Sequence, residues 1–322
     1  ILCLTFIIIG FSTWLMLPIR ANANVVINEN NPSSARELLA YYNLEQYPKT
    51  HLFYGPLFTE QYAYLDEKNP YVDAKPKYEK DKEKGEYVIV NDYKNADYNF
   101  NSKQASVLPR MWSGEHAENY MMFSGFLDFK IKPEYQMENG LRSLVSDFKN
   151  NVARGNVDYE DYNNFLKNYG QQFLEVEKPS LGSNILYMLE YQLGYMYWRY
   201  FMWNFSGRQD DIQGRYDDLH GNWISGIGPV DHLHLGMSQD NLPSDVKNNK
   251  ARNTYYMLPL ILGLIGFLFV LAKDPKRFWV LLVFFLFTGL AIQFYTNVRP
   301  FEPRERDYSV VGSFYVFAIW IG

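Results

Sequence analysis

The sequence has a single cysteine, Cys3, and no stripe of basic residues. With one cysteine the chain can form no internal disulfide, so any exported part must be held together by packing, which suits a bacterial envelope protein better than a disulfide-stapled ectodomain. The net charge is -5, which gives no electrostatic footprint for nucleic acid. We therefore expect no nucleic-acid partner.

Charged residues are also missing from four runs, which cover residues 1–19, 255–272, 278–296 and 309–322. A helix needs about 17–25 apolar residues to cross a hydrocarbon core of about 30 Å, and the first three runs reach that length. The predicted fold class is a mainly α-helical membrane protein. It has three full transmembrane helices, a truncated fourth and a large extracytoplasmic α+β insertion. Because the chain begins and ends inside apolar runs, we expect it to be a fragment cut at both ends.

The loop Lys273–Arg277 predicts the topology. It has three basic residues in five and a proline, and short basic loops stay in the cytoplasm. The predicted location is the bacterial inner membrane, with a multi-pass topology. Residues 20–254 would form the periplasmic region and residues 297–308 a charged outer loop.

The aromatic segment 183–205 is long enough to cross a bilayer, but it contains Glu190 and Arg199. A charge in a span costs about 2.5–3.5 kcal/mol on insertion scales. We therefore interpret the segment as an interfacial or buried helix, and a core helix of the polar region is the alternative. Whether it crosses the membrane stays open.

Local patterns predict further elements in the polar region. Expected are a capped helix at 28–47, strands at 51–58 and 86–93, a solvated loop tip at 75–84, a helix at 148–173 and a long polar connection at 207–250.

Two polar clusters precede the second apolar run and could contact a sugar or an acceptor. Glu29 follows the first apolar run, where it belongs either to a turn before a helix cap or to a site for substrate hydroxyls. Arg199, Arg208, Asp210 and Asp211 lie beside aromatic rings that could stack on a sugar or an isoprenoid chain. Structural packing with ion pairs at its rim explains this second cluster equally well.

The histidine-containing sequence Asp231-His232-Leu233-His234, with His220 upstream, could bind a divalent metal. The pattern is short and lies in a glycine-rich loop, so we interpret these residues as exposed loop histidines. We predict no metal site and no firmly implied cofactor.

The outer loop contains the cluster with the strongest chemical signal. Arg299, Arg304 and Arg306 could bind a phosphate, because guanidinium groups match phosphate oxygens in a bidentate arrangement. Glu305 and Asp307 could position an attacking hydroxyl or contact the acceptor. The alternative is a self-neutralising cluster of salt bridges.

Several motifs together carry a family resemblance: INENNP, YWRYFMWNFSGRQDDIQG, GNWISGIG, ARNTYYMLPLILGLIG and RPFEPRERDYSVVGSFYVFAIWIG. They resemble a bacterial membrane family related to the protein O-mannosyltransferases of the GT-C superfamily. The resemblance extends over nearly all of the chain.

The resemblance implies a glycosyltransferase that takes a sugar, mannose-like, from a polyprenyl-phosphate carrier and transfers it to a Ser or Thr hydroxyl of an exported protein. In that superfamily the catalytic acidic residue lies in the first outer loop, which we expect upstream of residue 1, so we name no catalytic base. A non-catalytic, membrane-anchored envelope scaffold or receptor is the rival hypothesis. A lipid transporter or flippase is a third.

Overall fold

The computed structural model describes residues 2–47, 50–81 and 83–322, and the chain divides into two compact units. The first unit is formed by Ile1–Thr50 and Tyr71–Tyr98. The second is formed by His51–Pro70 and Asn99–Gly322.

The first unit begins with an unbroken apolar helical segment made of α1 (Leu2–Ser12), η1 (Thr13–Leu15) and α2 (Met16–Ala21). The predicted capped helix is present as α3 (Ala35–Tyr42). Ser34 caps it, and Glu37 completes a capping box with the Ser34 backbone amide.

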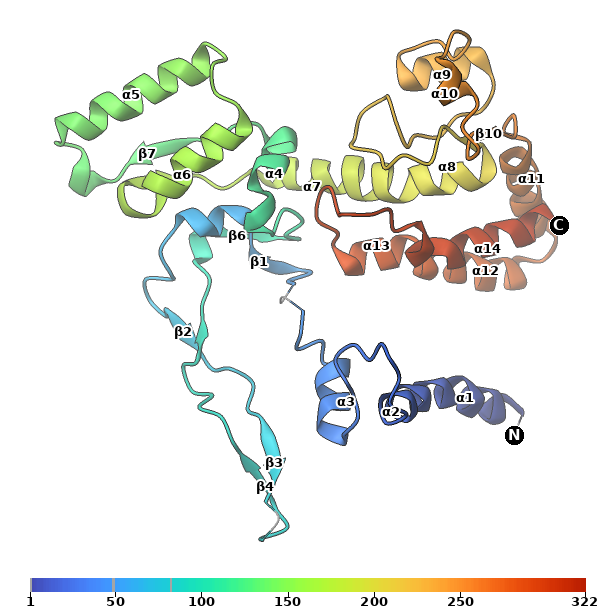
Figure 1. The fold of residues 1–322 in the computed structure, drawn as a ribbon, viewed down its shortest axis with the longest axis horizontal. Helices are drawn as coiled ribbons and strands as arrows, with labels where there is room; N and C mark the ends of the chain where they lie inside the picture. Colours follow the sequence, from blue (N-terminus) through green and yellow to red (C-terminus); the bar gives the residue numbers. More distant parts are fainter. Residues whose placement is uncertain (1, 48–49, 82) are drawn as a thin grey trace. The chain divides into compact units, whose positions relative to one another are not determined.

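Two antiparallel strand pairs complete this unit (Figure 1). Strand β2 (Tyr71–Val72) pairs with β5 (Asp97–Tyr98), and β3 (Tyr78–Lys80) pairs with β4 (Tyr87–Ile89). The predicted strand at 86–93 is confirmed by β4. The loop predicted at 75–84 is wrong for residues 78–80, because their backbone pairs with β4; the prediction at residue 82 lies outside the described residues.

The second unit begins with an α+β region, whose helices and strands are seen in Figure 1. Its strand pairs are β1 (Tyr54–Pro56) with β6 (Ala105–Val107) and β7 (Phe129–Ile131) with β8 (Leu174–Val176). Its α-helices are α4 (Ala117–Ser124), α5 (Asn139–Ala153) and α6 (Tyr159–Phe173), and its short 3-10 helices are η2 (Phe58–Tyr62), η3 (Ser102–Gln104), η4 (Gly114–His116) and η5 (Pro133–Tyr135).

These elements confirm one local prediction and refine another. The strand predicted at 51–58 is present as β1. The helix predicted at 148–173 is two helices, because Gly155 takes a φ of 74° and Asp158 then caps α6.

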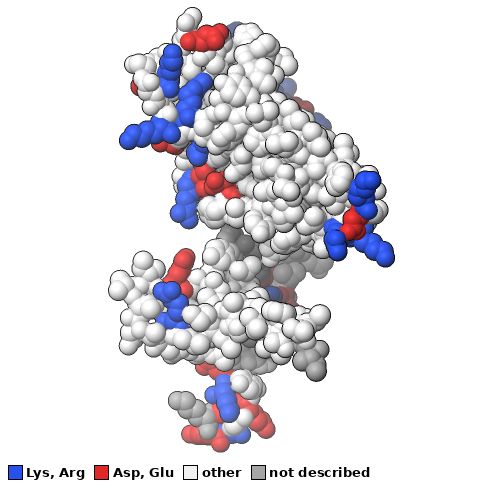
Figure 2. Space-filling model, turned by 90° about the vertical axis from the view of Figure 1, so that its right-hand side faces the viewer, with Lys and Arg blue, Asp and Glu red and all other residues white. Residues whose placement is uncertain are grey.

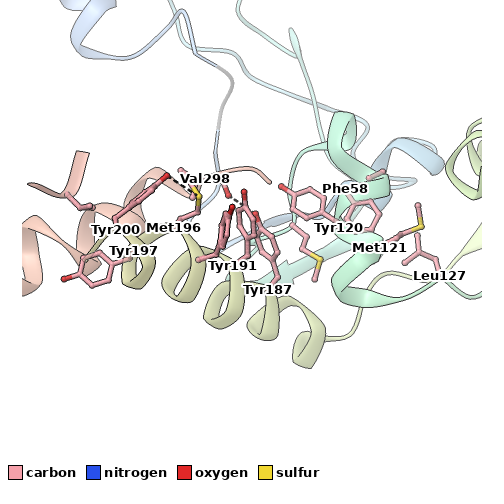
Figure 3. Packing of buried hydrophobic residues seen from close by; sticks show 14 of the residues in the cluster. Phe58, Tyr120, Met121, Leu127, Tyr187, Tyr191, Met196, Tyr197, Tyr200 and Val298 are labelled. Carbon is pink, nitrogen blue, oxygen red and sulfur yellow. Dashed lines mark hydrogen bonds between the residues drawn. The ribbon is translucent and has the colours of Figure 1, made fainter. Parts of the chain in front are cut away.

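The aromatic segment 183–205 is a continuous helix formed by α7 (Leu181–Tyr187), the π-helical η6 (Met188–Trp198) and α8 (Arg199–Phe205). Tyr187, Tyr191 and Tyr200 are fully buried in a cluster that includes Tyr120 and Phe58 (Figure 3). The segment therefore forms a core helix of the second unit, as the alternative interpretation expected, and Glu190 stays on its exposed side.

The rest of the second unit is largely helical. In chain order it contains β9 (Gly207–Arg208), α9 (Gly228–Leu235), α10 (Ser244–Lys247), β10 (Asn253–Thr254), α11 (Leu258–Lys273), α12 (Pro275–Thr288), α13 (Leu290–Thr296), η7 (Asp307–Val310) and α14 (Val311–Ile321); β9 pairs with β10. Helices α11 and α14 pack closely because Gly263 and Gly266 face Phe317 and Trp320 without a side chain between them.

The prediction of a multi-pass membrane fold is wrong. The chain is 53% helical with small two-stranded sheets, and among the described residues 2 helices, Leu2–Ala21 and Pro275–Thr296, are long and apolar enough to cross a membrane. The run at 255–272 fails because Tyr256 and Met257 adopt φ values of 54° and 57°, so the helix starts only at Leu258. At a rise of about 1.5 Å per residue, its 16 residues cover about 24 Å.

The apolar helices still leave much hydrophobic surface open. Leu262, Phe269, Val280 and Phe287 each expose about half or more of their surface. Figure 2 shows a broad uncharged face on the molecule, with charged residues gathered at its margins. The two candidate helices and this surface are consistent with association with a membrane.

Candidate functional site

The candidate site is the segment between α13 and η7, residues 297–306, which contains the predicted phosphate-binding arginines. Two buried side chains fix its start. Arg110 donates from Nη1 to the Phe294 carbonyl (2.8 Å), and the Asn297 amide donates to the Pro109 carbonyl (2.9 Å). Asn297 itself has a φ of 44°, which ends α13 and turns the chain.

Three tyrosines of the core helix hold the backbone of the segment. The Tyr187 hydroxyl donates to the Val298 carbonyl (3.0 Å), while the Phe301 amide donates to the Tyr191 hydroxyl (2.8 Å) and the Arg306 amide to the Tyr200 hydroxyl (3.1 Å). The helix η6, which contains Tyr191, is π-helical, with backbone hydrogen bonds between residues i and i+5. Short π-helical turns are found frequently at functional sites. The rings of Tyr187 and Tyr191 stack with centroids 5.4 Å apart, so the hydroxyls point to one side. We call these three residues the tyrosine ladder.

Glu302 lies between two of the predicted arginines. Its carboxylate accepts from Arg306 Nη2 (2.8 Å) and from Arg299 Nε (3.4 Å). The Glu302 side chain is 6% exposed, whereas those of Arg299 and Arg306 are 31% and 38% exposed. Two half-buried cations thus share one buried carboxylate, and the trio carries a net positive charge.

Two further titratable residues, His116 and Glu115, lie beside this trio. Burial, and after it the positive charge of Arg299, hold the pKa of the His116 imidazole below its usual value. Arg299 also reaches the exposed carboxylate of Glu115 at 3.5 Å. Arg306 Nε is buried without a partner among the described residues. With Glu115 included, two arginines face two carboxylates, and the two guanidinium groups remain 31% and 38% exposed.

The remaining predicted residues of the segment take different positions. Glu305 is bound to Arg199 (Nη2–Oε2 2.7 Å), to the Tyr200 hydroxyl (2.5 Å) and to the Gly214 amide (3.1 Å). Burial alone would raise the pKa of Glu305, but these partners outweigh it and hold the pKa below the usual value. Arg304 is exposed with its guanidinium 5.9 Å from the Tyr308 ring, and Asp307 is half-buried at the start of η7.

Arg199 is engaged on all sides. It is 3% exposed, it donates to Glu305 and to the Gly221 carbonyl (2.6 Å), and its guanidinium lies 3.9 Å from the Tyr195 ring centroid. No donor group of Arg199 is left open to a ligand in this arrangement. Arg199 and Glu305 therefore join the core helix, the loop after it and the 297–306 segment.

The loop after the core helix contains the other predicted contacts. Arg208 stacks on Trp203 at 4.0 Å and donates to the Asp210 carbonyl, and buried Asp210 accepts from His220 Nδ1 (2.9 Å) and the Gly221 amide. Asp211 is exposed and accepts from Asn249. These residues fold the loop, as the structural alternative expected.

The remaining candidates from the sequence are Glu29, His220, His232 and His234. Glu29 lies on an exposed turn of the first unit. His234 stacks on Trp223 (4.0 Å), His232 is exposed, and Asp231 accepts from Ser225 and Gly226. No group of three potential metal-ligating side chains lies together in the described part of the chain.

Sequence reasoning missed the residues that organise the site. Glu302 lies three residues after Arg299 and four before Arg306, but the segment is not helical, so this spacing alone did not predict the shared carboxylate. The tyrosine spacing in 187–200 was visible in the sequence. The contacts of His116 and Arg110 with this segment had no local signal, because they join residues far apart in the chain.

Comparison with known proteins adds little. Residues 48–189 match a family described as a family of unknown function (DUF8416), which is less than half of the chain. No curated protein and no solved structure matches the chain.

Proposed function

We propose that this protein is a membrane-associated glycosyltransferase of the GT-C type. It takes a mannose-like sugar from a polyprenyl-phosphate carrier and transfers it to Ser or Thr hydroxyls of exported proteins. The observation that carries the proposal is the trio of Arg299, Glu302 and Arg306. Its two arginine side chains are 31% and 38% exposed and follow the end of an apolar helix.

The chemistry of a lipid-linked phosphate fits this arrangement. A phosphodiester needs donors in a fixed fork and an electropositive surrounding, and the tyrosine ladder fixes the backbone that presents the arginines. The apolar surface of α12 and α13 offers a face for the carrier chain. Arg304 extends the positive charge toward solvent. We assign no catalytic base among these residues.

The proposed location is the bacterial inner membrane. Pro275–Thr296 is a candidate span, and the basic residues Lys273, Lys276 and Arg277 lie at its start.

The test is sugar transfer by membranes that contain the full chain, with a radiolabelled polyprenyl-phosphate mannose and a Ser/Thr-rich acceptor peptide. We expect the double variant Arg299→Gln/Arg306→Gln to lose transfer by at least about 100-fold, since each charge-assisted contact contributes about 1.5–3 kcal/mol. The matched control is Arg142→Gln, an exposed arginine on α5, which should keep full activity. A folded double variant with unchanged transfer would refute the assignment and favour the scaffold or receptor hypothesis.

A further inference from the structure

A cleft of about 750 Å³ lies in the α+β region of the second unit, far along the chain from the arginine segment. Strand β8 and the end of β7 form one wall. The other is formed by residues near Tyr64 and by residues 101–104. Its volume falls within the range of about 300–1,000 Å³ typical of small-ligand sites. All of its lining residues fall inside the matched segment 48–189.

The charges around the cleft cancel. Its lining contains four lysines (Lys103, Lys130, Lys132 and Lys178) and four glutamates (Glu67, Glu134, Glu175 and Glu177). Lys130 pairs with Glu177 at 2.8 Å and Lys103 with Glu67 at 3.4 Å, while Lys132 and Lys178 donate to backbone carbonyls. The cleft is therefore rich in donors and acceptors but has no net charge, which favours a neutral polar ligand over an anion.

An exposed aromatic ring lines the same cleft. Tyr64 is 57% exposed, and its ring is held by Lys132, whose Nζ lies 4.7 Å from the centroid. The Tyr64 carbonyl accepts from Asn101, which fixes the backbone beneath the ring. A flat apolar face surrounded by fixed hydrogen-bonding groups matches a sugar ring, which has an apolar C–H face and a polar edge.

A peptide fits less well, because the edge of β8 is already occupied. Gln104 Nε2 donates to the Val176 carbonyl (2.8 Å), and the Leu174 amide donates to the Gly170 carbonyl. An extended peptide would need these backbone groups in order to add a strand. From the neutral lining, the tyrosine face and the blocked edge, we propose that this cleft binds a neutral oligosaccharide.

The test uses the purified full chain in detergent and four neutral tetrasaccharides as probes: mannotetraose, maltotetraose, cellotetraose and chitotetraose. Binding is measured by saturation-transfer NMR and calorimetric titration. At least one probe should bind saturably with a millimolar Kd. Tyr64→Ala should weaken binding by at least about tenfold, in line with the loss measured when alanine replaces an aromatic ring that stacks on a nucleobase. Tyr64→Phe, which keeps the ring, should bind as the native chain does.

The matched control is Tyr54→Ala, which removes a tyrosine that is 54% exposed on β1 and does not line the cleft. It should leave the Kd unchanged. Absence of saturable binding by every probe, or equal binding by Tyr64→Ala, would overturn the proposal. The proposal would also be overturned if a Ser/Thr-rich peptide displaced the bound probe and if Tyr64→Ala weakened the binding of that peptide. The measurement requires no sugar transfer, so its outcome is separate from that of the transferase assay.

Discussion

Replacing Glu305 with alanine should loosen the segment that carries the arginines. In the native chain Glu305 is 18% exposed and neutralises Arg199, which is 3% exposed. Its removal leaves a buried cation without a counter-charge and deprives the Tyr200 hydroxyl and the Gly214 amide of their acceptor. Breaking a buried ion pair from one side costs about 3–5 kcal/mol.

This cost should appear locally in amide hydrogen exchange. If closure of residues 207–222 and 297–308 loses about 3–5 kcal/mol, exchange there accelerates roughly 10²-fold to more than 10³-fold, up to the limit set by global unfolding. Glu305→Gln retains the shape and should have a smaller effect. The matched control is Glu177→Ala, which breaks the exposed pair with Lys130 and should change stability by no more than about 1 kcal/mol.

The pair can also be tested by a double-mutant cycle. Arg199→Met combined with Glu305→Ala should lose less stability than the sum of the two single variants, because the double variant leaves no buried charge unpaired. Equal exchange in Glu305→Ala and Glu177→Ala, together with additive single effects, would refute the idea that this pair secures the segment.

Two further predictions concern packing and titration. Gly266→Ala should destabilise the chain by several kcal/mol, because the new methyl group would overlap the Trp320 backbone carbonyl on α14. The control Gly10→Ala, in open space on α1, should be neutral or slightly stabilising. Thermal unfolding compares the two variants, and equal midpoints would contradict the close packing of α11 on α14. Arg299→Gln should raise the pKa of His116, because burial would remain but the neighbouring positive charge would be gone. Since the folded pKa of His116 lies below its unfolded value of about 6.5, its contribution to stability should fall as the pH drops below that value, and less so in the variant. Titration of the His116 imidazole by NMR measures the change in its pKa, and Arg142→Gln is the control. An unchanged pKa of His116 in Arg299→Gln would contradict the proximity of Arg299 to His116.

Local signals predicted the elements that local physics decides. The capped helix in 28–47, of which α3 forms residues 35–42, the strand in 86–93 and the helix at 183–205 were predicted from neighbouring residues. The membrane prediction failed where hydropathy and backbone geometry disagree. The apolar residues before Leu258 are not helical, because the chain there takes left-handed φ values.

Only part of the candidate site could be predicted from the sequence. Arg299 and Arg306 were identified from the local cluster of charged residues, and both belong to the trio. The role of Arg199 was not, because its pairing with Glu305 joins residues 106 positions apart, and sequence distance hides such a contact. Arg199, predicted as a sugar or acceptor contact, is instead a structural link between the core helix and the 297–306 segment.

The tyrosine ladder has a consequence for how this site could change over evolutionary time. The hydroxyls of Tyr187 and Tyr191 form hydrogen bonds with main-chain atoms of Val298 and Phe301, so these bonds do not depend on which side chains follow. Residues 299, 304 and 306, whose side chains are at least partly exposed, can be exchanged while the backbone path stays constant. Point substitutions at these positions would therefore change which lipid headgroup the segment binds, while the tyrosine ladder keeps the backbone in place.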